Sequence, residues 1–111
     1  MNIQIFGAAK CFDTKKAERY FKERGIGFQS VDLKRFGMSR GELKSAAAAL
    51  GGAEKLLNSA SPDAAIVTYL AYEEDKLEKL FEKPSLIRTP VVRNGKQATV
   101  GYCPEIWKTW E

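Results

Sequence analysis

The first third of the chain changes from an alternating pattern of apolar and polar residues to a helical one and back. Residues 2–6 alternate and predict a short strand that Gly7 closes. Residues 13–24 repeat their apolar positions at three- and four-residue spacing, which predicts an amphipathic helix with Gly25 as its C-terminal cap. Residues 27–33 alternate again as a second strand. Two strands joined by one such helix are expected to be parallel, with a right-handed crossover between them.

The middle of the chain has a helical pattern throughout. Residues 39–50 open with a Ser-x-x-Glu capping box and run through four alanines, so we expect a helix with a close packing surface. Residues 53–57 predict a short helical turn after a Gly-Gly break. A further helix is expected with Pro62 at its first position, and residues 75–82 predict another.

The last third returns to strands. Residues 86–93 are apolar around a proline and predict a strand, and the pair at 94–95 is Asn-Gly, a strong hairpin signal. Residues 96–101 are the expected return strand, and 104–110 are expected to close the chain as a helix. The order predicts an α/β fold in one domain, 1–111, with a helical insertion at about 39–83.

Composition restricts the class of protein. The 111 residues are 44% hydrophobic and 29% charged, which is typical of a globular domain with its own core. No signal-peptide pattern and no apolar run of membrane-spanning length is present, so we expect no membrane partner. Two cysteines far apart do not form a secreted disulfide scaffold. We therefore expect a cytoplasmic protein.

The chain contains no histidine, which removes imidazole as a general base and as the commonest metal ligand. Two cysteines alone supply too few donors for a closed zinc site, so no metal and no bound cofactor is expected. The formal net charge is +4, with lysine and arginine spread along the chain. This charge favours solubility or attraction to an anionic ligand or acidic protein surface; no motif predicts direct nucleic-acid binding.

Cys11 stands at the entrance of the first predicted helix. Unpaired N–H groups and the positive end of the helix dipole stabilise a thiolate there. Thr14 follows three residues later, where a dithiol site would carry its second cysteine. Thr14 can hydrogen-bond the thiolate, and Lys10 and Lys15 add favourable charge, whereas Asp13 opposes it. The alternative interpretation of Cys11 is an inert, buried small residue.

These residues and their order resemble the glutaredoxin-type arsenate reductase and Spx-like proteins of the thioredoxin superfamily. The resemblance covers nearly the whole chain. Its markers are Cys11 at the helix entrance, Lys15-Lys16-Ala17, Asp32, Gly51-Gly52, Leu86-Ile87-x-x-Pro90, and Val100-Gly101-Tyr102 followed by Glu105 and Trp107. The resemblance implies a thioredoxin-like fold with a four-stranded mixed sheet and a cis Thr89-Pro90 bond facing the thiol.

The family's arsenate chemistry is attack of the thiolate on a bound oxyanion, followed by transfer of the adduct to glutathione or another thiol. In the true reductases an essential arginine directly precedes the cis-proline, but here that residue is Thr89, with Arg88 displaced by one position. A one-residue shift in a strand turns a side chain to the other face. The family's other two arginines fall on Asn58 and Cys103. We therefore expect arsenate reduction to be inefficient.

Two functions remain open from the sequence. In the first, Cys11 and Thr14 form a single-thiol oxidoreductase site that acts with glutathione, another low-molecular-weight thiol or a thiol protein. Lys10, Lys15, Arg88, Thr89 and Pro90 would then bind the anionic or thiol substrate. In the second, the chain is an Spx-like regulator that binds RNA polymerase without catalysis, although it lacks the Cys-x-x-Cys pair usual in that group. Cys103 is either a resolving thiol for Cys11 or a buried, unreactive one.

Overall fold

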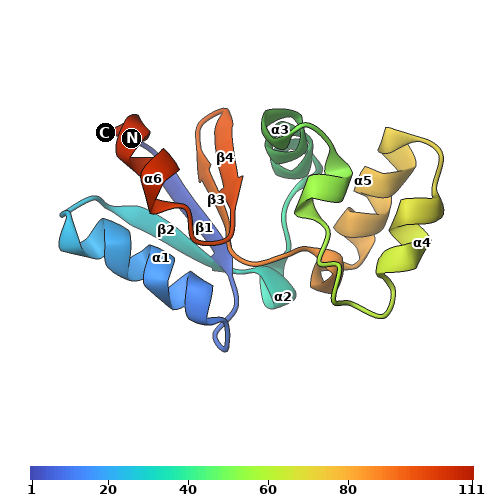
Figure 1. The fold of residues 1–111 in the computed structure, drawn as a ribbon, viewed down its shortest axis with the longest axis horizontal. Coiled ribbons are helices and arrows are strands. Elements are labelled where there is room, and N and C mark those ends of the chain that lie inside the picture. Colours follow the sequence, from blue (N-terminus) through green and yellow to red (C-terminus); the bar gives the residue numbers. More distant parts are fainter.

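The computed structural model describes residues 1–111 as a four-stranded sheet with helices on both faces (Figure 1). Helices α3, α4 and α5 lie together toward one end of the molecule, which measures 42 × 26 × 22 Å. The elements, with 3-10 turns labelled η, are β1 Ile3–Gly7, α1 Phe12–Glu23, β2 Phe28–Asp32, α2 Leu33–Phe36, α3 Arg40–Leu50, η1 Ala53–Leu56, α4 Ala64–Tyr69, α5 Glu73–Glu82, η2 Pro84–Leu86, β3 Val91–Asn94, β4 Gln97–Val100, α6 Pro104–Trp107 and η3 Lys108–Trp110.

The sheet has the strand order β2-β1-β3-β4. Strands β1 and β2 are parallel, and β3 is antiparallel to both β1 and β4. The predicted mixed sheet and the parallel strand–helix–strand unit are therefore confirmed. Because the carboxyl end of β1 leads directly to α1, the start of that helix lies at the carboxyl end of the parallel strand pair.

Each face of the sheet carries its own apolar core. Ile3 and Ile5 of β1 point to the face covered by α1 and α6, where Phe21 and Trp107 are fully buried. Phe6 points to the other face and joins the core formed with the helical insertion. This division follows from the alternation of side chains along a strand. The Trp107 indole N–H donates to the Thr99 hydroxyl at 2.8 Å, which anchors α6 on the sheet.

The last strand pair differs from the sequence prediction in two respects. Strand β3 begins only at Val91, because residues 84–86 form a 3-10 turn, Ile87 forms an isolated bridge with Leu57, and residues 88–90 are irregular. The hairpin turn consists of Gly95 and Lys96 because Asn94 pairs with Gln97 in the ladder. Gly95 has φ +60°, which suits the first central position of a two-residue hairpin turn.

The helix expected to begin at Pro62 begins two residues later, at Ala64. Ser61 instead organises a separate turn, since its hydroxyl accepts from the Asp63 N–H at 3.4 Å and its carbonyl from the Ala64 N–H at 3.1 Å. Helix α2 was not predicted. It starts where the Asp32 carboxylate accepts a hydrogen bond from the Lys34 N–H at 3.1 Å.

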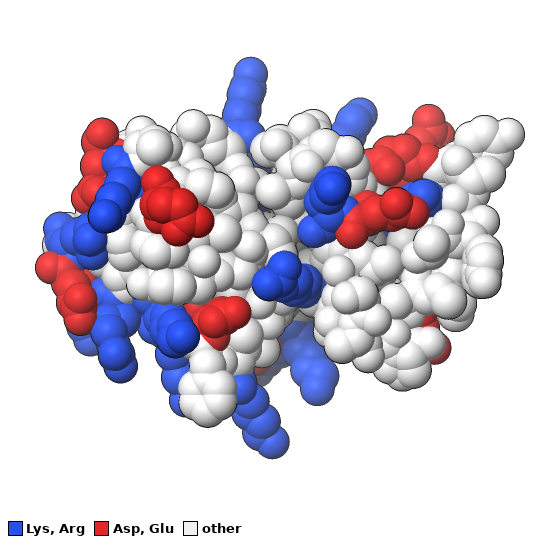
Figure 2. Space-filling model, viewed as in Figure 1, with Lys and Arg blue, Asp and Glu red and all other residues white.

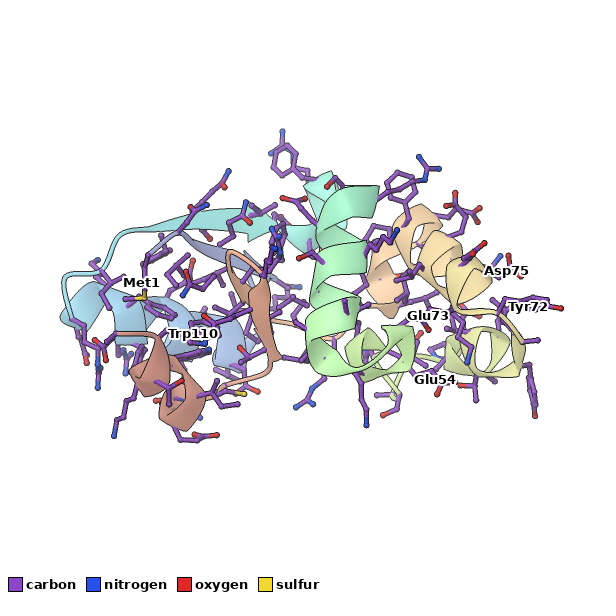
Figure 3. All side chains as sticks on the ribbon, turned by 90° about the horizontal axis from the view of Figure 1, so that it is seen from above. Met1, Glu54, Tyr72, Glu73, Asp75 and Trp110 are labelled. Carbon is purple, nitrogen blue, oxygen red and sulfur yellow. The ribbon has the colours of Figure 1, made fainter.

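Polar contacts hold the insertion together. The predicted capping box of α3 is present, with Ser39 and Glu42 bonded reciprocally. The Glu73 carboxylate at the start of α5 accepts from the Ala53 N–H at 2.7 Å, and Lys76 pairs with Glu54 at 2.7 Å. Figure 3 shows Glu54 and Glu73 in this lobe, far from Met1 and Trp110, which lie side by side at the opposite end.

No helix of the structure combines the length and the apolar character that a membrane crossing requires. No group of three or more histidine, cysteine, aspartate or glutamate side chains is placed to hold a metal ion.

Candidate thiol site at the start of helix α1

Cys11 is the N-cap residue of α1, in extended backbone conformation with φ −91° and ψ 117°. Its N–H donates to the Ala8 carbonyl at 3.1 Å, and its own carbonyl accepts from the Lys15 N–H at 3.3 Å. The side chain is half-buried. The predicted position of a thiol at the helix entrance is therefore confirmed, and Cys11 is not the fully buried residue of the alternative interpretation.

Thr14 lies behind this loop and packs against the end of β1. It is only 5% exposed, and its hydroxyl accepts from the Ala8 N–H at 3.3 Å. Gly7 makes this approach feasible, because a Cβ at that position would stand 2.2 Å from Cγ2 and 2.7 Å from the Oγ1 of Thr14. The sequence identified Gly7 only as the end of a strand and missed its role in seating Thr14.

The Thr89-Pro90 peptide bond is cis, as the resemblance implied. The Thr89 carbonyl lies 3.7 Å from the Cys11 sulfur, and the neutral thiol donates to that oxygen. Pro90 is buried, and its carbonyl accepts from the Gly101 N–H at 2.9 Å. A residue 78 positions away in sequence thus forms one wall of the thiol site.

Opposing effects set the pKa of Cys11. Burial acts to raise it, but hydrogen bonds from the hydroxyls of Thr14 and Thr89 and from the N–H groups of Thr14 and Asp13 favour the thiolate. Their combined effect holds the pKa of the Cys11 thiol below its ordinary value. The thiolate is the nucleophilic form, so this surrounding raises the reactivity of Cys11 at neutral pH.

Lys10 and Lys15 have a smaller part than the sequence suggested. Both side chains are exposed, Lys10 on the loop and Lys15 on the first turn of α1. The groups that lower the Cys11 pKa against the effect of burial are hydroxyl and backbone N–H groups, not these lysines. Lys15 instead lines a pocket of about 350 Å³ together with Thr14, Glu18 and Asp32.

Cys103 is also an N-cap residue, at the start of α6. Its thiol donates to the Val100 carbonyl at 3.3 Å, and both cysteines are free in the structure. Burial and then the carboxylate of Glu105 raise the pKa of Cys103, while the charge of Arg88 acts in the opposite direction. A resolving role for Cys103 stays a prediction.

Arg88 lies before β3, so the alternation of a strand does not decide where its side chain points. Its N–H donates to the Leu56 carbonyl at 2.8 Å, and its exposed guanidinium lies against Gly101. A Cβ at Gly101 would stand 3.1 Å from the Nη2 of Arg88. Arg88 is thus placed between the cis-proline segment and Cys103.

A second pocket, of about 290 Å³, shares Thr89 and Ala8 with the thiol site. Its lining residues are Ala8, Leu33, Lys34, Asn58, Pro84, Ser85, Ile87 and Thr89. Asn58 and Thr89 are two of the positions that the resemblance matched to oxyanion arginines, and the structure brings them to one pocket. Lys34 is the only cation there. The sequence missed Lys34, because its place depends on the unpredicted helix α2.

The family model for the ArsC family matches residues 6–110. The chain belongs to the ArsC family. Among curated proteins, Global transcriptional regulator Spx 2 of Oceanobacillus iheyensis is 28% identical over 109 residues, covering 92% of this chain and 78% of that protein.

Solved structures agree on the fold. A protein from Bacteroides fragilis described as ArsC family related superposes with a TM-score of 0.86 at 20% identity, covering 100% of this chain and 98% of that one. An arsenate reductase from Vibrio cholerae gives 0.82 at 22% identity, covering 96% and 94%. A glutaredoxin-like NrdH-redoxin from Escherichia coli gives 0.53 at 17% identity, covering 100% and 96%, so this ArsC-family fold is thioredoxin-like.

In this ArsC-family chain the predicted site residues fall into three groups. Cys11, Thr14 and the Thr89-Pro90 bond meet around the thiol. Arg88 and Cys103 are neighbours of each other at the β4–α6 connection. Lys10 and Lys15 stand in solvent at the rim.

Proposed function

We propose that this protein is a single-thiol oxidoreductase in which Cys11 is the nucleophile. The observation that supports this most strongly is the lowered pKa of Cys11, since two hydroxyls and two backbone N–H groups converge on its thiolate. Such groups stabilise the negative charge without being consumed in the reaction. The half-buried sulfur is reachable from the molecular surface.

The reaction we propose is thiol–disulfide exchange with glutathione or another low-molecular-weight thiol. The Cys11 thiolate attacks the glutathione sulfur of a mixed disulfide between glutathione and a protein, and the protein leaves as its thiolate. Cys11 then carries the glutathione. A second glutathione thiolate attacks this mixed disulfide, releasing oxidised glutathione and regenerating the Cys11 thiolate. In each cycle one protein sulfur is reduced to a thiol and one free glutathione thiol is oxidised, because the other sulfur of the released disulfide was already oxidised in the substrate, and no second protein cysteine is required.

Thr14 and the Thr89-Pro90 segment have distinct roles in this proposal. Thr14 stabilises the thiolate from within the fold, whereas Thr89 and Pro90 form the wall along which the disulfide chain aligns. Lys10 and Lys15 attract the carboxylates of glutathione from the rim. Arg88 extends this positive rim toward the β4–α6 connection.

Arsenate is a poorer substrate for this site. An oxyanion next to a thiolate needs converging cations, preferably the bidentate fork of arginine. The pocket beside Thr89 offers Lys34 alone, with the uncharged Asn58 opposite. Arsenate-dependent oxidation of glutathione is expected to stay near background, whereas exchange with small disulfides proceeds.

The second candidate function is an Spx-like regulator that binds RNA polymerase in the cytoplasm. The observation that favours it is the 28% identity with the regulator Spx 2 over 92% of this chain. This function needs the fold and its surface but not a reactive thiol. It predicts that replacing Cys11 by serine leaves the association with RNA polymerase intact.

The test is to incubate the protein with oxidised glutathione and to locate the adduct by mass spectrometry of peptides. The adduct is expected on Cys11 in the unmodified protein and in Cys103→Ser, and to be lost in Cys11→Ser. Turnover of a glutathionylated peptide should follow the same pattern. An adduct confined to Cys103, or no turnover despite a Cys11 adduct, would overturn the proposal. Capture of purified RNA polymerase by Cys11→Ser would then support the regulator.

A further inference from the structure

A third pocket, of about 550 Å³, is a cleft between α1 and the C-terminal segment, away from the Cys11 loop. Its lining residues are Lys16, Arg19, Tyr20, Glu23, Arg24, Tyr102, Pro104 and Lys108. Four cations face one carboxylate there, and Figure 2 shows lysine and arginine side chains crowding the edge of the molecule that α1 forms. None of these residues takes part in the thiol chemistry described above.

The cations of this cleft are largely unpaired. Lys16, Arg19 and Lys108 take part in no ion pair. The one ion pair of Arg24 is a long one, at 3.9 Å from the Glu111 carboxylate, and its Nη1 also donates to the Tyr20 carbonyl at 3.4 Å. Elsewhere on the surface the chain makes close pairs, such as Arg40 with Glu78 at 2.7 Å. Cations held near one another repel unless an anion lies between them.

Tyr20 supplies an unpartnered polar group at the base of the cleft. Its side chain is 4% exposed, and its buried hydroxyl makes no hydrogen bond of normal length, although burial and then the nearby Glu111 carboxylate raise the pKa of this phenol. A buried hydroxyl without a partner is costly, so a ligand that satisfies it gains affinity. The Arg24 guanidinium stacks on the Tyr20 ring at 3.7 Å, which places a cation beside the hydroxyl-bearing ring.

The place of Glu111 indicates that the corner of the cleft beside Arg24 accepts an anion. Its carboxylate is 38% exposed and approaches Arg24, so an anionic group already lies at this corner of the cleft. Tyr102 forms another wall, with a ring that is 42% exposed and lies beneath the Lys16 ammonium at 5.7 Å. The cleft therefore combines arginine, lysine, a hydroxyl donor and an accessible aromatic ring.

We propose that the α1–α6 cleft binds a small molecule carrying two or more phosphate groups. One phosphate takes the place of the Glu111 carboxylate and contacts Arg24 and the Tyr20 hydroxyl, and the next one lies among Arg19, Lys16 and Lys108. A diphosphate uses this arrangement better than separate carboxylates do, because it concentrates charge and acceptors in a short span that arginine binds in bidentate fashion. The cleft volume also fits a small ligand.

Calorimetric titration of the Cys11→Ser protein with inorganic pyrophosphate and with ADP, at physiological ionic strength, tests this independently of the thiol. Both probes are expected to saturate one site, and a decamer of glutamate to bind more weakly. If Tyr102→Ala weakens ADP but not pyrophosphate, the exposed ring contacts the nucleoside and the site favours a nucleotide. If it changes neither affinity, the ligand is recognised through its phosphates alone.

Variants locate the site. Arg19→Gln should weaken pyrophosphate about tenfold, since it removes a charge-assisted hydrogen bond. Lys22→Gln changes the net charge equally but lies outside the cleft, so it should change affinity by less than about twofold. Glu111→Gln should tighten binding about threefold by removing the competing carboxylate.

Tyr20→Phe separates ligand recognition from packing. It should weaken pyrophosphate binding while the thermal midpoint of unfolding stays level or rises, because an unpartnered buried hydroxyl is removed. Equal losses in Lys22→Gln and Arg19→Gln, an unchanged affinity in Tyr20→Phe, or tighter binding of the glutamate decamer than of pyrophosphate would each overturn the proposal.

Discussion

Cys11 and Cys103 occupy similar positions, yet their surroundings shift the pKa of the thiol in opposite directions. Each is the N-cap of a helix, each is half-buried, and each thiol donates to a backbone carbonyl. The pKa of Cys11 is nevertheless lowered, and that of Cys103 is raised. A helix start alone therefore does not make a cysteine reactive.

The difference comes from the neighbours and from the length of the helix. Around Cys11, burial is outweighed by donors from Thr14, Thr89 and the first turn of α1, a helix of 12 residues. Around Cys103, burial is reinforced by Glu105 in the first turn of α6, which has 4 residues. A short helix offers little dipole, and a carboxylate next to the sulfur opposes its ionisation.

Among the residues around Cys11, Gly7 is the position where a substitution should have the largest effect. Replacing Gly7 by alanine should destabilise the fold by about 2–3 kcal/mol, because its Cβ would overlap Thr14. It should also displace the Thr14 hydroxyl and slow alkylation of Cys11. Urea unfolding measures the first effect and timed alkylation the second.

Gly27→Ala is the matched control for this substitution, since a Cβ there meets nothing within 4 Å. It should change stability by less than about 0.5 kcal/mol. If Gly7→Ala behaved like Gly27→Ala, the seating of Thr14 against β1 would be wrong.

Thr14 itself should account for much of the difference between the two thiols. Thr14→Val keeps the shape but removes a donor to the thiolate, so the pKa of Cys11 should rise. Its alkylation rate at neutral pH should fall about three- to tenfold, the equivalent of one hydrogen bond. Thr68→Val on α4, whose hydroxyl donates to the Ala64 carbonyl, is the control and should leave the rate unchanged.

The smallest effect is expected at Cys103. Glu105→Gln removes a charge that raises the Cys103 pKa, and Arg88→Gln removes one that lowers it. Alkylation of Cys103 should therefore quicken about twofold in the first variant and slow in the second, as expected for exposed charges. Rates that move in the same direction in both variants would refute this electrostatic assignment.

The sequence predicted the parts of the site that depend on neighbouring residues. The place of Cys11 at the entrance of α1, the capping box at Ser39 and the parallel strand–helix–strand unit all follow from short-range patterns, and the structure confirms them. The resemblance added the cis bond before Pro90.

What escaped prediction depends on contacts between distant segments. Short-range patterns could not place Thr89 beside Cys11, because the two residues lie 78 positions apart, and only the resemblance implied that this segment faces the thiol. The pocket with Asn58 and Lys34 requires α2, which forms because the Asp32 side chain caps it. The small contribution of Lys10 was also hidden, because a charge matters only where its side chain points, and the fold leaves it in solvent.

The most direct test of the central claim compares both cysteines in one sample. The protein is alkylated briefly at a series of pH values, and peptide mass spectrometry gives the modified fraction at each position. The rate at Cys11 should reach half its maximum below the pH found for the same cysteine in the urea-unfolded chain, and the rate at Cys103 above it. Coincident midpoints in the folded protein, or the reverse order, would contradict the assignment of Cys11 as the thiolate nucleophile.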